Sequence, residues 1–105
     1  MDFEKIKEFI RKKDYLVSEH ADEERIKDKL TMENLEEAIL AGEVIEERLD
    51  DPRGESRLIA GKTSTGQLVH ITIGTRSDKP VIVTVYKPAL EKWIRGKIRR
   101  RRSTQ

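Results

Sequence analysis

The chain has 105 residues, of which 35% are hydrophobic and 40% charged, and it contains no cysteine. This length accommodates one domain with a modest core. The lack of cysteine excludes disulfides, thiolate metal sites and cysteine nucleophiles. No apolar run approaches the ~20 residues of a membrane span, and the N-terminus lacks the apolar core of a signal peptide. We therefore expect a cytoplasmic protein that does not engage a membrane.

The two halves of the chain carry opposite charge. Residues 1–51 have nine Lys and Arg against 17 Asp and Glu, whereas residues 52–105 have 13 against three. The segment from Lys92 onward holds seven basic residues and no acidic one. This split fits a molecule with one surface for a polyanion and another for a basic partner. A solvated charged surface without any partner explains the composition equally well.

The first half of the chain has helical spacing of its apolar residues. Phe3, Ile6 and Ile10 predict an amphipathic helix over residues 2–13, followed by a short strand-like run over residues 15–17. Ser18 is a predicted N-cap for a second helix, with acidic residues near its positive end. Thr31 is the N-cap of a third helix that Gly42 ends, and this helix turns Leu35 and Ile39 inward.

The second half alternates in the manner of strands. We predict four strands, over residues 44–49, 57–62, 68–75 and 80–86, with turns at residues 51–54 and 63–66. Pro88 then opens a final helix whose apolar side is formed by Leu90, Trp93, Ile94 and Ile98.

The predicted fold class is α+β: N-terminal helices packed on a four-stranded antiparallel sheet, with a basic C-terminal helix. Residues 1–98 form one domain, and residues 99–105 form a basic, flexible tail.

Pairing the last two strands as a hairpin has a consequence for their faces. One face carries Val69, Ile71 and Ile73 together with Val81, Val83 and Val85, and packs on the helices. The other face then brings together His70, Thr72, Thr84 and Tyr86, because side chains alternate along a strand. We expect Arg57, Lys62 and Lys87 near this second face.

These residue types fit cleavage of RNA without a metal. The reaction requires a base for the 2′-hydroxyl, an acid for the leaving 5′-oxygen and a cation for the phosphate. His70 is either the base or the acid, Tyr86 is a weaker donor, and Arg25, Arg57 or Lys62 holds the phosphate. A histidine and a tyrosine that serve only sheet packing are the alternative.

The other histidine, His20, lies four residues before Glu24 on one face of the second helix, where the carboxylate can orient the imidazole. No spacing typical of a metal site involves it, so we predict neither a metal nor any other cofactor. The basic run over residues 97–102 is either a phosphate-binding arm or a solubilising tail.

Several segments in order resemble a prokaryotic domain family of unknown function, which would cover the chain from Tyr15 to Trp93. The similar segments are residues 16–25, 36–39, 42–46, 51–54, 69–71 and 84–88. That family looks like a distant relative of the RelE- and BrnT-type toxins of toxin–antitoxin pairs, compact α+β domains that engage RNA. Ala89 departs from the pattern, since related sequences often carry an acidic residue there.

The resemblance implies a role as an RNA-cutting toxin. It points to His20, Arg25, Arg53, His70 and Tyr86 as site residues, and to a small antitoxin with a zinc motif as the partner. We therefore expect a metal-independent endoribonuclease acting on RNA. The alternative is a non-catalytic module that binds a protein or a nucleic acid through its charged segments.

Overall fold

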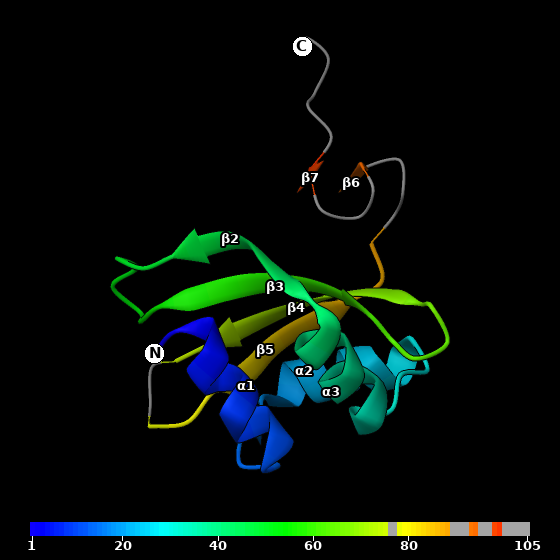
Figure 1. Ribbon diagram of the computed structural model, residues 1–105, viewed down its shortest axis with the longest axis horizontal. Coiled ribbons are helices and arrows are strands. Elements are labelled where there is room, and N and C mark those ends of the chain that lie inside the picture. Colours follow the sequence, from blue (N-terminus) through cyan, green and yellow to red (C-terminus); the bar gives the residue numbers. More distant parts are fainter. Residues whose placement is uncertain (76–77, 89–92, 95–97, 100–105) are drawn as a thin grey trace, which may run out of the picture.

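The computed structural model describes residues 1–75, 78–88, 93–94 and 98–99. The elements follow in the order α1 (Phe3–Arg11), β1 (Leu16–Val17), α2 (Glu19–Lys27), α3 (Met32–Ala41), β2 (Glu43–Arg48), β3 (Ser56–Lys62), β4 (Leu68–Gly74), β5 (Val81–Tyr86), β6 (Trp93–Ile94) and β7 (Ile98–Arg99). Helices α1, α2 and α3 form a layer on one face of the sheet (Figure 1). The predicted α+β class is confirmed.

Each helix of this layer begins with a side chain that accepts a hydrogen bond from its first turn. The N-caps are Asp2 in α1, Ser18 in α2 and Thr31 in α3. Such caps satisfy backbone amides that have no partner inside the helix. Gly42 follows α3 as its C-cap. The sequence-based assignments of Ser18, Thr31 and Gly42 are therefore confirmed.

The sheet differs from the predicted one by an additional strand. Strands β2 to β5 form the expected antiparallel meander, but β1 joins at the far edge, in the order β1-β5-β4-β3-β2. Leu16 and Val17 pair in parallel with Val81 and Ile82. The prediction of four antiparallel strands was wrong in this respect. A two-residue strand is too short to show alternation, and its partner lies more than sixty residues away in the sequence.

The predicted C-terminal helix is also wrong where the structure describes that part of the chain. Trp93–Ile94 pairs antiparallel with Ile98–Arg99 as β6 and β7. This pair lies on the side of the sheet away from the helices (Figure 1). The residue types explain the difference, because aromatic and β-branched residues favour strands and the intervening Gly96 disfavours a helix. Leu90 and the tail residues 100–105 lie outside the described residues.

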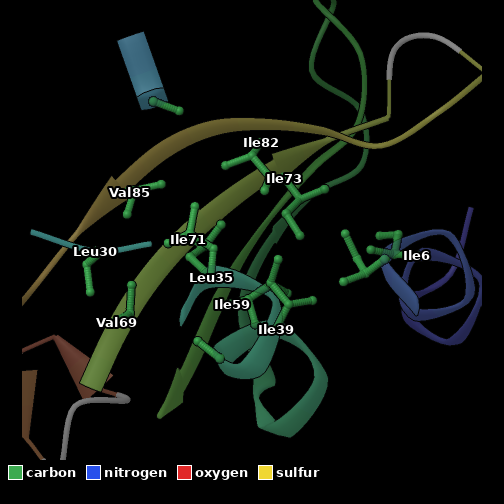
Figure 2. Packing of buried hydrophobic residues seen from close by; sticks show 13 residues of the cluster. Ile6, Leu30, Leu35, Ile39, Ile59, Val69, Ile71, Ile73, Ile82 and Val85 are labelled. Atoms are coloured by element: carbon green, nitrogen blue, oxygen red, sulfur yellow. The ribbon is translucent and has the colours of Figure 1, made fainter. Parts of the chain in front are cut away.

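The core lies between the sheet and the helices. Figure 2 shows isoleucine, leucine and valine side chains from β3, β4 and β5 meeting those of α1 and α3. The fully buried strand residues are Ile59, Val69, Ile71, Ile73, Ile82 and Val85; those of the helices include Ile6, Leu35 and Ile39. Burial of this apolar surface, at roughly 25 cal/mol per Å², is the main stabilising contribution to the fold.

An irregularity in β5 corrects the predicted faces of the hairpin. Ile71 pairs with Val85 as expected, but Ile73 pairs with Ile82 because the register shifts between them. Val83 is the extra residue of this β-bulge. Ile82 therefore occupies the core, whereas Val83 is 37% exposed. The placement of Val81 and Val83 against the helices was wrong, because strict alternation does not hold across a bulge.

Helix α3 packs on β3 with backbone against backbone. A Cβ atom added to Gly61 of β3 would lie 1.8 Å from the carbonyl oxygen of Ala38, and one added to Gly42 would lie 2.6 Å from the same oxygen. Real Cβ atoms essentially never come within 3.0 Å of another heavy atom, so a neighbour would have to move. A side chain at either glycine would therefore push the end of α3 away from the sheet.

Gly61→Ala should destabilise the protein by about 3 kcal/mol, since a methyl group cannot fit without moving α3. Urea unfolding followed by circular dichroism measures this change. Gly66→Ala is the matched control, because Gly66 has a φ of 89° but open space where its Cβ would lie. Gly66→Ala should lower the free energy of unfolding by only roughly 1 kcal/mol, the strain of a left-handed backbone at an alanine. Equal destabilisation by the two substitutions would contradict the close packing.

A partly buried carboxylate joins the start of β1 to α3. Glu36 accepts hydrogen bonds from the Tyr15 hydroxyl at 2.5 Å and from Lys13 Nζ at 2.7 Å. Burial, followed by the hydrogen bond to Glu36, raises the pKa of Tyr15 well above its ordinary value. In the folded protein Tyr15 thus stays neutral at a pH where the unfolded chain ionises it.

The raised pKa of Tyr15 predicts that the folded protein loses stability at alkaline pH. The stabilisation linked to Tyr15 should be complete below about pH 10, the ordinary pKa of tyrosine, and should be lost as the pH rises further. Tyr15→Phe should lower stability at pH 7 and flatten the decline above pH 10. Unfolding free energies of both proteins between pH 7 and pH 11 test this. Parallel curves would show that Tyr15 ionises equally in the folded and unfolded states.

Candidate functional site

The face of the sheet turned away from α1, α2 and α3, here called the outer face, collects the polar strand residues. Antiparallel pairing places His70 opposite Tyr86 and Thr72 opposite Thr84. The next strand contributes Ala60 opposite His70 and Leu58 opposite Thr72. The predicted grouping of His70, Thr72, Thr84 and Tyr86 on one face is therefore confirmed. The bulge leaves it intact because the register shift lies beyond Thr84.

His70 and Tyr86 form a hydrogen-bonded pair on the outer face. His70 Nδ1 and the Tyr86 hydroxyl are 3.2 Å apart, with the donor set by the histidine tautomer. The two rings meet edge to face, with centroids 5.3 Å apart and an interplanar angle of 65°. His70 is fully buried, whereas Tyr86 is partly exposed. Tyr86 is thus the member of the pair that a ligand can touch, and His70 supports it from behind.

A cavity of about 660 Å³ lies against the outer face beside this pair. Tyr86 forms part of its wall together with polar and charged residues of all four antiparallel strands. The lining includes Glu46, Arg48, Asp51 and Arg53 from β2 and its turn, Ser56 and Leu58 from β3, Thr72 and Gly74 from β4, and Val81, Val83 and Thr84 from β5. This volume lies within the usual range for sites that bind small molecules.

Two arginines give the β2 side of the cavity cationic groups. The predicted turn over residues 51–54 is present, with Gly54 N donating to the Asp51 carbonyl at 2.9 Å. The Arg53 backbone amide, its side chain and the charge of Arg48 hold the pKa of Asp51 below its ordinary value. Arg53 is 80% exposed. Arg48 is exposed too, and its charge acts on Asp51.

Of the other predicted phosphate-binding residues on the strands, Arg57 is among the residues that line the cavity, whereas the two lysines are not. Arg57 pairs across from Ile73 and therefore belongs to the helix side of the sheet. Its side chain is only 7% exposed, with Nε bonded to Glu47 at 3.1 Å and Nη1 3.5 Å from Glu55. Lys62 ends β3 and Lys87 follows β5, and both are exposed. Neither lysine lines the cavity, so the cationic residues of its lining are Arg48, Arg53 and the ion-paired Arg57.

His20 and Arg25 lie in α2, on the opposite side of the sheet from His70. His20 is 65% exposed, and its Nε2 lies 3.4 Å from Glu24, the predicted i,i+4 partner. Arg25 bonds to Asp22 at 2.8 Å and to the Leu30 carbonyl at 3.1 Å, which connects α2 to the loop before α3. The fold therefore does not bring the two histidines into one site.

The contribution of β2 to the cavity was not predicted from the sequence. Glu46 pairs with Leu58 and Arg48 with Ser56, which places both on the outer face. Their spacing of two residues indicates that Glu46 and Arg48 share a face of β2. An irregularity between Val44 and Glu46, however, shifts the register of β2 against β3. Without knowing that shift, alternation from Val44 assigns Glu46 and Arg48 to the helix side.

Two further findings concern metal binding and membrane insertion. Over residues 1–75 and 78–88, no three His, Asp or Glu side chains lie close enough together to hold a metal ion. None of the helices described is long and apolar enough to cross a bilayer.

Comparison with known proteins identifies the family. No curated protein and no solved structure matches the chain. Residues 17–87, from β1 to the end of β5, match the model of a family described as a domain of unknown function, DUF4258. The match includes α2, α3 and every strand that lines the cavity. The chain therefore belongs to the DUF4258 family.

Proposed function

We propose that the protein is a metal-independent endoribonuclease whose active site is the cavity on the outer face. The observation that carries this proposal is the hydrogen bond between the Tyr86 hydroxyl and the fully buried His70, with Tyr86 in the cavity wall. Arg48 and Arg53 line the same cavity and provide positive charge for a phosphate. RNA offers both a phosphodiester and a neighbouring hydroxyl for such a set of groups.

The chemistry needs one base, one acid and one cation. Glu46, in the cavity wall, takes the proton of the ribose 2′-hydroxyl, and the 2′-oxygen attacks phosphorus. The bond from phosphorus to the 5′-oxygen breaks, and the leaving oxygen takes the proton of the Tyr86 hydroxyl. His70, donating from Nδ1, stabilises the phenolate that forms. The products are a 2′,3′-cyclic phosphate and a 5′-hydroxyl, and Arg48 and Arg53 bind the phosphate as its charge develops.

This assignment changes the roles expected from the sequence. His70 acts through Tyr86, because its buried ring cannot reach a substrate directly. Arg25 and Arg57 stabilise the fold through their ion pairs. The sequence resemblance to RelE- and BrnT-type toxins suggests a biological setting for such an activity. We extend the proposal to that biology: the ribonuclease acts as a toxin that a small antitoxin neutralises.

A binding module without catalysis is the second candidate. It is favoured by α2, in which Ile26 is 60% exposed and whose first turn carries Glu19 and Asp22. An exposed apolar side chain on a helix with an acidic first turn fits a partner protein with a basic surface. A wild-type protein that is folded and leaves RNA intact would favour this candidate.

Tyr86→Phe should slow RNA cleavage by about 100-fold, the lower range for loss of a general acid, while the ring still packs on His70. The measurement is the single-turnover cleavage rate of a labelled single-stranded RNA in the presence of a chelator. Tyr15→Phe is the matched control, since it removes the same hydroxyl on the helix side and should retain the wild-type rate. His70→Asn should retain part of the activity, because an amide can replace Nδ1 as the donor.

Equal rates for wild type and Tyr86→Phe would contradict the proposed acid. A substitution of His20 in α2 that abolishes cleavage without unfolding the protein would place the active site on the other side of the sheet.

A further inference from the structure

The cavity on the outer face has an apolar side as well as a charged side. Val81, Val83 and Leu58 line it, and Val83 is among the more exposed large apolar residues of the described chain. A Cβ on Gly74 would lie 3.4 Å from Val83 Cγ2, an ordinary van der Waals contact, so these two residues are neighbours in the cavity wall. The bulge in β5 therefore places an isopropyl group in the cavity that regular alternation would have turned away.

The backbone at the bulge is held in place from the helix side. The Ser18 hydroxyl donates to the Val83 carbonyl at 3.0 Å and accepts from Ala21 N at 3.0 Å. One hydroxyl thus satisfies a bulge carbonyl and caps α2. Because β1 pairs with β5 only at Val81 and Ile82, this bond fixes the next residue along the strand. A fixed apolar surface binds a flat ligand with a smaller entropic cost than a mobile one.

The charged and apolar sides together match one chemical class. Arg48 and Arg53 attract an anion, Thr72 and Thr84 offer hydroxyls, and Val81 and Val83 offer apolar contact. We infer that the cavity binds one unstacked nucleotide of a single-stranded RNA, with its base on Val81 and Val83 and its phosphate on Arg48 and Arg53. This inference rests on the proposed function and specifies its substrate. A base inside a duplex is stacked on both faces and is excluded.

The test uses adenosine 3′-monophosphate and ribose 5-phosphate as probes, with binding followed by methyl NMR. Adenosine 3′-monophosphate should shift the methyl signals of Val81, Val83 and Leu58, whereas ribose 5-phosphate should leave them nearly unchanged. Val83→Ser should weaken binding of the nucleotide about fivefold, the loss expected for part of one apolar contact, and leave binding of ribose 5-phosphate unaltered. Ile26→Ser, an equally conservative change on α2, is the control and should alter neither.

Unchanged nucleotide affinity in Val83→Ser, or methyl shifts confined to other parts of the molecule, would overturn the inference. Cleavage assays with the same variants separate it from the proposed function. If the wild type cuts RNA and Val83→Ser binds and cuts equally well, the base site is wrong and the ribonuclease stands. If the nucleotide binds at Val83 but no RNA is cut, the base site stands and the ribonuclease is wrong.

Discussion

The contact between the end of α3 and the backbone of β3 determines which face of the sheet is covered. At Gly61 and Gly42 no side chain separates helix from strand, so α3 lies as close to the sheet as backbone atoms permit. Apolar side chains of β3, β4 and β5 can then reach α1 and α3 across a thin core. Because that face is used for burial, alternation assigns His70, Thr72, Thr84 and Tyr86 to the outer face. The polar side chains therefore gather on the outer face because the apolar side chains of the same strands are buried on the other face.

The bulge residue of β5, Val83, adds an apolar side chain to the polar residues of the outer face. Without the bulge, Val83 would continue the alternation that begins with Val85 and would lie in the core. With it, Ile82 fills the core and Val83 lies in the cavity, while the polar pairs at Thr84 and Tyr86 keep their register. Ser18 compensates for the disrupted pairing by hydrogen bonding to the bulge carbonyl. A β-bulge that redirects a side chain beside a cavity is a common arrangement at functional sites.

Local signals in the sequence were sufficient for the three N-terminal helices, for the caps at Ser18, Thr31 and Gly42, for the four long strands and for the face shared by His70 and Tyr86. They failed at the C-terminal end, where β6 and β7 replace the predicted helix. Non-local pairing was not predictable: β1 is too short to alternate, and its partner β5 is distant in the chain. The two register shifts, near Ile45 and Val83, explain why Arg48 was missed and Val83 misplaced. Side-chain burial was not predictable either, because no local signal indicates that His70 is buried and hydrogen bonded to Tyr86.

Photocrosslinking tests most directly the central claim that the outer face of the sheet engages RNA. Single-stranded RNA containing 4-thiouridine is irradiated with the wild-type protein, and the crosslinked peptides are mapped by mass spectrometry. Crosslinks should fall in β4 and β5, around Thr72 and from Val81 to Tyr86, and unlabelled adenosine 3′-monophosphate should compete with them. Crosslinks confined to α2 and α3, where His20 and Arg25 lie, would contradict the account.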